Sequence, residues 1–121
     1  MSMRSSQESA LLHRSLENGR REAVERSCAL LRREGFVVSR VVASRSRRTV
    51  GAPDLLAASG PRVMRVFVLL DGEVDAAETR GRIRAASRLG ETRVYVRWPL
   101  SWRVLSNLAR WGVPGVSVVG W

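Results

Sequence analysis

The chain has 121 residues, which is long enough to bury one hydrophobic core and too short for two. It contains no apolar run of membrane-spanning length, and its first residues lack the apolar core of a signal peptide, so we expect a cytoplasmic protein without membrane contacts. A net charge of +10, carried by arginines alone, points to nucleic acid as the partner, because guanidinium groups bind phosphates bidentately. The single cysteine, Cys28, excludes an internal disulfide and a cysteine-based zinc site.

Two units are expected along the chain. Residues 1–19 form an arm or a short helix, which Asn18 and Gly19 end. Residues 20–121 form a single α/β domain.

The elements of that domain follow from apolar periodicity and from turn residues. In chain order we expect a helix over 20–34, a strand over 36–42, a basic loop over 43–50, strands over 53–58 and 63–70, a helix over 75–89, a strand over 92–98, a helix over 102–111 and a strand over 115–119. Asp75 and Ser101 are the predicted N-caps of the last two helices. The strand over 63–70 is apolar on both faces, which is typical of a central strand covered on both sides. The fold class is therefore α/β, with a mixed central sheet flanked by helices in the order α-β-β-β-α-β-α-β.

Several stretches of this chain resemble archaeal Holliday-junction resolvases of the PD-(D/E)xK nuclease superfamily over residues 20–97. The stretches are Ala23-Val-Glu-Arg26, Leu31-Arg-Arg-Glu-Gly-Phe-Val-Val-Ser-Arg40, Ala43-Ser-Arg-Ser-Arg-Arg48 and Pro53-Asp-Leu-Leu-Ala57. The resemblance implies a restriction-endonuclease-like fold and branched DNA as the ligand. It also implies a divalent-metal site that a helix glutamate, the Pro-Asp aspartate and a Glu-x-Lys pair on the next strand would form.

The chain lacks the family's residues at most positions of that metal site. Asp54 matches the Pro-Asp aspartate, but Val68 and Leu70 stand where the family has its glutamate and lysine. Glu25 lies one residue from the family's spacing, which puts Val24 in register and turns the carboxylate by about 100° around the helix. We therefore expect a nuclease fold with a degenerate site and no cofactor.

One alternative keeps catalysis. Asp71 and Glu73 directly follow the strand and could join Asp54 in a relocated magnesium site, which would make the protein a metal-dependent endonuclease. The other interpretation is that these acids are caps and solvated charges, and that Asp54 bonds backbone amides.

A second resemblance, to the C-terminal domain of archaeal tRNA-splicing endonuclease subunits, rests on the strand entry and on Arg84-Ala-Ala-Ser-Arg-Leu89. That family cleaves RNA with tyrosine, histidine and lysine. Here Ser87 stands at the histidine position, and His13, the chain's only histidine, lies in the arm. This resemblance implies a structural, non-catalytic subunit.

Two sets of arginines are candidates for nucleic-acid binding. The first lies on or beside the basic loop and consists of Arg40, Arg45, Arg47 and Arg48. The second is spaced i, i+4, i+8 along one helix and consists of Arg80, Arg84 and Arg88. For both sets the alternative is an ordinary solvated surface. Few residues of the sequence are suited to reading bases, so we expect recognition of the backbone and of shape rather than of base sequence.

The four tryptophans all fall in the last 24 residues: Trp98, Trp102, Trp111 and Trp121. Such residues complete a core, form a subunit interface or stack on unpaired bases. We expect an oligomer, either a homodimer or a heteromer with a catalytic subunit.

Overall fold

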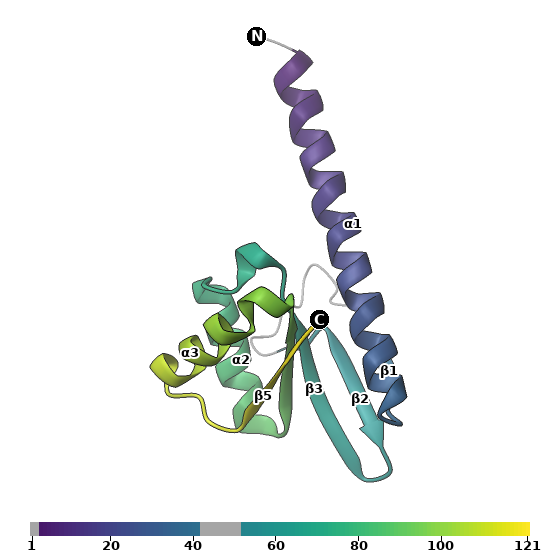
Figure 1. Ribbon diagram of the computed structural model, residues 1–121, viewed down its shortest axis with the longest axis vertical. Helices are drawn as coiled ribbons and strands as arrows, with labels where there is room; N and C mark the ends of the chain where they lie inside the picture. Colours follow the sequence, from purple (N-terminus) through teal and green to yellow (C-terminus); the bar gives the residue numbers. More distant parts are fainter. Residues whose placement is uncertain (1–2, 42–51) are drawn as a thin grey trace.

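The computed structural model describes residues 3–41 and 52–121, with side chains from residue 18 onward within those ranges. The chain forms one sheet with helices on both faces (Figure 1), which confirms the expected α/β class with a mixed sheet flanked by helices. The elements are, in order, α1 Met3–Arg33, β1 Val37–Arg40, β2 Leu55–Ser59, β3 Arg62–Val68, the 3-10 helix η1 Asp71–Glu73, α2 Ala77–Leu89, β4 Thr92–Val96, the 3-10 helix η2 Trp98–Leu100, α3 Ser101–Trp111 and β5 Val116–Gly120.

The five strands lie in the sheet in the order in which they occur in the chain. β1, β2 and β3 pair antiparallel, and β3, β4 and β5 pair parallel. The hairpin between β2 and β3 turns at Gly60, whose φ of 60° is a left-handed conformation that favours glycine. The two parallel connections run through α2 and α3, because parallel neighbours need a crossover rather than a tight turn.

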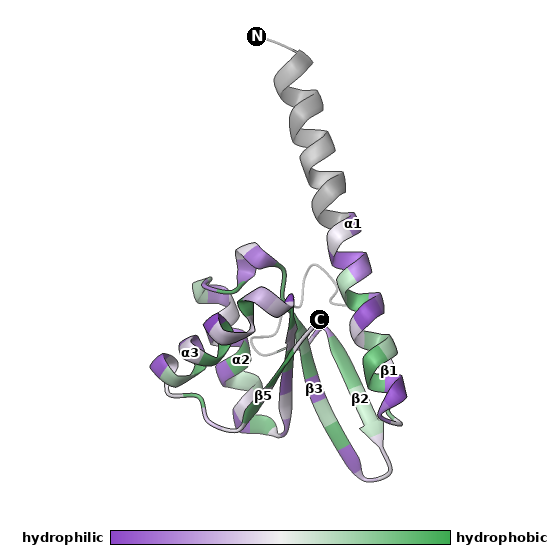
Figure 2. Cartoon of the chain, viewed as in Figure 1, coloured by the Kyte–Doolittle hydropathy of each residue, from purple (hydrophilic) through white to green (hydrophobic). Residues whose placement is uncertain are grey.

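β3 is the middle strand and contributes to a core on each face of the sheet. Val66 and Val68 pack in the core under α1, whereas Phe67 joins the core that α2 and α3 cover. All three are buried, which confirms the expectation of a central strand covered on both sides. Figure 2 shows hydrophobic residues along β2 and β3 and a mixture of hydrophilic and hydrophobic residues along the helices.

α1 is longer than the sequence pattern predicts. It runs without a break through Asn18 and Gly19, so the prediction that these residues end a helix is wrong. A glycine inside a helix costs about 1 kcal/mol but does not interrupt it, and Gly19 keeps a negative φ. Just beyond it, Arg20 pairs with Glu73 at 2.5 Å and Ala23 is buried, so contacts with the rest of the domain hold this turn. No helix among the described residues has the length and hydropathy that a membrane span requires.

The predicted N-caps are also wrong. α2 begins after Ala76 without a side-chain cap, because the Asp75 carboxylate instead accepts hydrogen bonds from Arg103 Nε at 2.9 Å and Asn107 Nδ2 at 2.8 Å. Ser101 is the first residue of α3, and its hydroxyl donates to the Trp98 carbonyl at 2.8 Å. Tertiary partners thus bind the Asp75 carboxylate, whereas the Ser101 hydroxyl bonds a carbonyl three residues earlier in the chain.

Arginine side chains from the starts of β3 and β4 contact the residues that follow α1. Arg93, whose side chain is only 11% exposed, donates to Glu34 at 2.6 Å and to the Tyr95 hydroxyl at 3.2 Å. Its guanidinium and that of Arg62 both lie over the Phe36 ring, at 5.9 and 5.0 Å from the centroid. The aromatic ring that follows α1 is therefore held between two cations.

Gly120 provides a test of the packing at the end of β5. A Cβ at this position would lie 2.8 Å from the Trp98 ring and 3.0 Å from its Cα, so backbone or ring must shift. We expect Gly120→Ala to lower the free energy of unfolding by about 1–3 kcal/mol, measured by urea denaturation. The matched control is Gly81→Ala, inside α2 with nothing within 4 Å, which should leave stability unchanged or raise it. Equal effects of the two substitutions would contradict this packing.

Glu91 makes stability depend on pH. Hydrogen bonds from Arg62 hold the pKa of this carboxyl below its ordinary value of 4.5. Its contribution is therefore fully present above pH 4.5 and is lost as the pH falls through the lowered folded-state value. Urea denaturation should show a stability difference between the wild type and Glu91→Gln at pH 7 that shrinks at pH 3. A difference that is constant across this range would contradict the assignment, and the exposed Glu25→Gln serves as the control.

Candidate functional site

Asp54 stands at the start of β2 with its carboxylate engaged by two elements. Oδ2 accepts a hydrogen bond from the Val68 backbone N–H at 2.8 Å, and Oδ1 accepts one from Arg82 at 3.3 Å. The side chain is 21% exposed. Its backbone N–H also pairs with the Val66 carbonyl at 2.9 Å, so the residue continues the ladder between β2 and β3. Asp54 thus joins β2, β3 and α2 through its own atoms.

Arg82 is the functional partner that sequence reasoning missed. Besides Asp54, it donates to the Ala52 carbonyl at 2.8 Å, and its guanidinium lies 5.1 Å from the centroid of Phe67. The signal that could have found it is its position directly before the buried Ile83, which places it on the flank of α2 nearest the sheet. The exposed i, i+4, i+8 arginine series drew attention to a different side of the same helix.

The positions at which the nuclease resemblance implies further metal ligands do not fit a metal ion. Val68 is buried in the core under α1, and the half-buried Leu70 and Val24 pack against the same core. Glu25 is exposed on α1. Magnesium takes hard oxygen ligands, which the side chains of Val24, Val68 and Leu70 do not offer, and the two Asp54 oxygens accept hydrogen bonds from Val68 N–H and Arg82.

The two carboxylates of the relocated alternative are each paired with a separate arginine. Asp71 accepts two hydrogen bonds from Arg97, at 3.0 and 2.5 Å, and this pairing raises the pKa of Arg97. Glu73 pairs with Arg20 and also accepts the Leu70 N–H at 2.9 Å. Within the described part of the chain, no three histidine, cysteine or acidic residues group in a way that could hold a metal ion. Asp54, Asp71 and Glu73 thus each pair with a different arginine.

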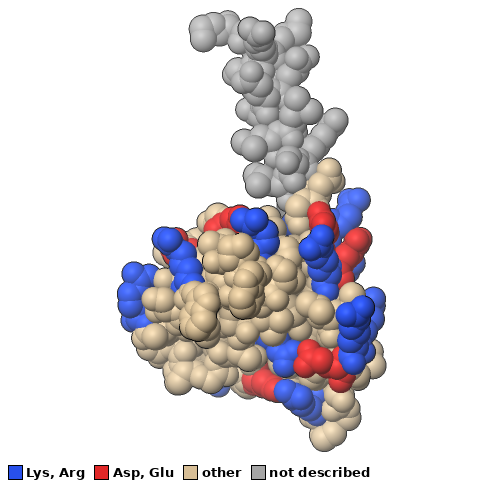
Figure 3. Space-filling view, viewed as in Figure 1, with Lys and Arg blue, Asp and Glu red and all other residues tan. Residues whose placement is uncertain are grey.

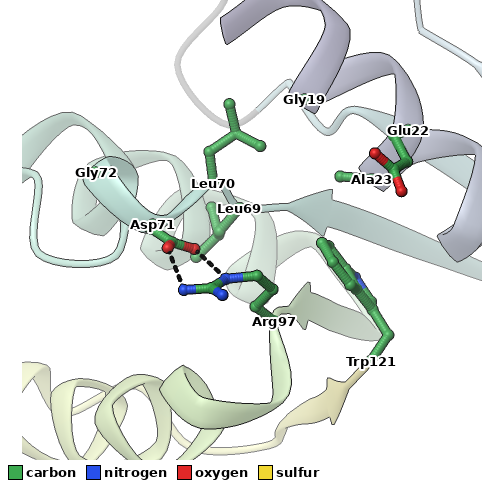
Figure 4. Close-up of a pocket in the computed structure, with 9 residues that line it drawn as sticks. All are labelled: Gly19, Glu22, Ala23, Leu69, Leu70, Asp71, Gly72, Arg97 and Trp121. Carbon is green, nitrogen blue, oxygen red and sulfur yellow. Dashed lines mark hydrogen bonds and ion pairs between the residues drawn. The ribbon is translucent and has the colours of Figure 1, made fainter. Parts of the chain in front are cut away.

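A pocket of about 330 Å³ opens beside Asp71, between α1 and the end of β3 (Figure 4). It is lined by Gly19, Glu22, Ala23, Leu69, Leu70, Asp71, Gly72, Arg97 and Trp121. Its charged side chains are satisfied within the protein, since Asp71 pairs with Arg97 and Glu22 pairs with Arg26 at 3.0 Å. The Trp121 indole N–H is buried and has no hydrogen-bond partner among the residues that the structure describes. The pocket is therefore mainly apolar, and the charged side chains that line it are paired with other residues of the protein.

The arginines of the basic loop, Arg45, Arg47 and Arg48, lie outside the described residues. The residues that flank this segment converge on Asp54: the Val41 N–H donates to the Asp54 carbonyl at 3.1 Å, and the Ala52 carbonyl accepts from Arg82. Arg40, at the end of β1, is exposed beside the first of these anchors. Both ends of the basic segment therefore start from the Asp54 corner of the sheet.

The predicted arginine series on α2 divides into two kinds. Arg84 is half-buried and donates to the Trp111 carbonyl at 2.7 Å, where the cation meets the negative end of the α3 dipole. Arg80 and Arg88 are exposed. Of the three, only these two remain available to a ligand.

Seven ion pairs join arginines to carboxylates within the described residues: Arg20–Glu73, Arg26–Glu22, Arg62–Glu91, Arg82–Asp54, Arg93–Glu34, Arg97–Asp71 and Arg103–Asp75. Among the same residues, the exposed arginines without a carboxylate within 4 Å include Arg21, Arg32, Arg33, Arg40, Arg80 and Arg88. The surplus of positive charge is therefore carried partly at the end of α1, on β1 and along α2.

The four tryptophans do not share one environment. Trp111 and Trp121 are partly buried and pack against the two cores, and Arg26 lies 5.6 Å from the Trp121 ring centroid. Trp98 and Trp102 are 63% and 74% exposed. Among the four tryptophans, Trp98 and Trp102 are therefore the two with enough exposed surface to contact a partner.

Comparison with known proteins gives no relative: no family model, no curated protein and no solved structure matches this chain.

Removal of the Asp54 carboxylate tests whether this residue has a structural role. We expect Asp54→Ala to lower the free energy of unfolding by about 2 kcal/mol, because it leaves the Val68 N–H unsatisfied and Arg82 unpaired. Urea denaturation measures the change, and the exposed Glu25→Ala should alter stability by less than about 0.5 kcal/mol. An Asp54→Ala variant as stable as the wild type would contradict the structural role.

Proposed function

We propose that this protein is a non-catalytic, nuclease-fold protein of the cytoplasm that binds the backbone of branched DNA and assists a catalytically active partner. The mixed sheet supports this assignment, because an antiparallel β1-β2-β3 meander followed by two parallel crossovers is the order that the resolvase resemblance implies. The finer restriction-endonuclease-like classification is part of the proposal.

The observation that carries the proposal is the state of Asp54. The one carboxylate that matches the nuclease motif accepts a backbone hydrogen bond and a guanidinium, and its neighbours at the acid and lysine positions are Val68 and Leu70. A carboxylate used in this way organises the start of β2 instead of a metal shell. In this proposal the corner corresponds to the place where a nuclease holds the scissile phosphate, with apolar side chains at the acid and lysine positions.

The exposed arginines that no described carboxylate pairs support the proposed binding of a nucleic-acid backbone. Arg40 is exposed beside the Asp54 corner, and Arg80 and Arg88 are exposed on α2, the helix that also supplies Arg82 to this corner. Bound phosphates would neutralise these arginines and relieve their mutual repulsion. The ion pairs elsewhere on the domain do not provide this neutralisation. Amide side chains that read bases are scarce, and Asn107 is buried with its amide bound to Val74 and Asp75. We therefore expect recognition of shape rather than of sequence.

The first test measures binding and its salt dependence in gel shifts with a four-way junction, plain duplex and bulged RNA. The junction should bind most tightly, and its affinity should fall roughly 10³-fold between 50 and 200 mM salt if about six phosphates are contacted. A preference for bulged RNA would instead support a structural subunit of an RNA-splicing endonuclease. Salt-independent binding would overturn the electrostatic basis of the proposal.

A matched pair of variants tests which arginines bind. The triple variant Arg40→Ala, Arg80→Ala, Arg88→Ala should lower the salt slope by about 0.9 for each phosphate that the protein no longer neutralises. Arg62→Gln removes a cation that is paired with Glu91, so the slope should stay close to that of the wild type. Equal slopes in both variants would place the binding surface elsewhere.

Cleavage assays on the same junction, with magnesium or manganese added, test the absence of catalysis. We expect no products from the protein alone. Cleavage that Asp54→Ala abolishes, in a variant shown by circular dichroism to be folded, would overturn the proposal in favour of the relocated site of Asp54, Asp71 and Glu73.

A further inference from the structure

A stripe of uncharged side chains on η2 and α3 is exposed to solvent. Trp98 and Trp102 are 63% and 74% exposed, and Leu105 is 43% exposed. Ser106 and Ala109 are exposed beside them, and these five residues form what we call the tryptophan face. Figure 3 shows an uncharged area over α3 and β5, with arginine and carboxylate atoms around its border. Large apolar side chains gathered in this way mark an interaction surface.

The tryptophan face exists because α3 has two different apolar sides. Val104 and Leu108 turn to the sheet and are buried in the core with Ile83. Trp102, Leu105 and Ala109 recur at i, i+3 and i+7 on the other side of the helix. The remaining exposed large hydrophobics, Val37, Val63 and Leu89, lie on other elements. Other residues of α3 therefore fill the core, and the side chains of the tryptophan face are free to contact a partner.

The order of side-chain sizes along the stripe fits a second copy of this chain. Its first half carries the large Trp98 and Trp102, and its second half carries the small Ser106 and Ala109. When two such helices cross antiparallel, the large half of one faces the small half of the other, so ridges meet grooves. A closed two-fold contact requires this kind of self-complementarity.

We propose that two copies of this protein pack α3 against α3 in antiparallel orientation, with the two-fold axis between Leu105 and Ser106. This arrangement sets Trp102 of one copy against Ala109 of the other, and Leu105 against Ser106. Trp98 then reaches the turn after α3, where Gly112 and Pro114 are exposed. The two helix dipoles oppose each other, which adds a favourable electrostatic term.

Charge also favours a second copy on this face. The chain carries a net charge of +10, so two copies repel each other through most of their surfaces. Beside the tryptophan face, Arg97 is paired with Asp71 and Arg103 is paired with Asp75 at 2.6 Å. Arg110, further round α3, donates to Asn107. A surface whose border consists mainly of neutral pairs lets like-charged copies approach and offers little to a phosphate backbone.

Sedimentation without nucleic acid tests the dimer independently of the proposed function. The wild type should be a dimer at micromolar concentration, and Trp102→Glu should raise the dimer Kd by roughly 30-fold or more, because buried tryptophans dominate interface energetics. Ala109→Arg, on the small half of the stripe, should have the same effect. Leu89→Glu alters an equally exposed apolar residue elsewhere and should remain dimeric. A monomeric wild type at about 100 μM concentration, or identical behaviour of Trp102→Glu and Leu89→Glu, would overturn the proposal.

A cross-linking variant tests the position of the two-fold axis. Ser106→Cys places a thiol beside the axis, and mild oxidation should give a covalent dimer on a non-reducing gel, since the native Cys28 is buried. Leu89→Cys should give none. Circular dichroism confirms that each variant is folded. If the wild type is a monomer and oligothymidine quenches its tryptophan fluorescence, the tryptophan face stacks on bases, and the dimer proposal is wrong.

Discussion

The second half of strand β3 is buried on both faces, and this constraint limits which chemistry the centre of the sheet can carry. Each residue from Val66 to Leu69 belongs to one of the two cores, so a charged side chain there would lose its hydration without a partner. Polar groups near the end of β3 therefore come from neighbouring elements, as Asp54 and Glu73 do when they accept the N–H groups of Val68 and Leu70. The same positions of β3 can carry either the apolar side chains that stabilise the centre of the sheet or the polar side chains that bind a metal ion.

Arginine serves two purposes in this domain. Where a carboxylate or a ring is close, as for Arg82 and Arg93, the planar guanidinium binds several groups at once and fixes elements that are far apart in the sequence. Where no carboxylate of the described residues lies within 4 Å, as for Arg40 and Arg80, it remains on the surface as positive charge. Because carboxylates are fewer than arginines, only some of the arginines are paired, and the others leave the surface basic.

Much of the fold could be predicted from the sequence, because periodicity is a local property. The alternation in β3 and the glycine stop at Gly112, which adopts a left-handed φ of 66°, indicated the right elements. Asp75 was misread because its partners, Arg103 and Asn107, lie far along the chain. The same limit hid Arg82 as the partner of Asp54. Sequence alone could not separate Trp102 from Trp111 either, since both occur in an apolar helix and only the position of the sheet shows which side is covered.

The sheet has the same strand order as the chain, from β1 to β5. No strand has to insert between two that are already paired, so the sheet can grow from one edge while the chain is being synthesised. The β2–β3 hairpin closes through a short turn and provides the first template, and each crossover helix then delivers one more strand to the open side. A folding order that matches the order of synthesis lets every new strand pair with the strand that precedes it in the chain.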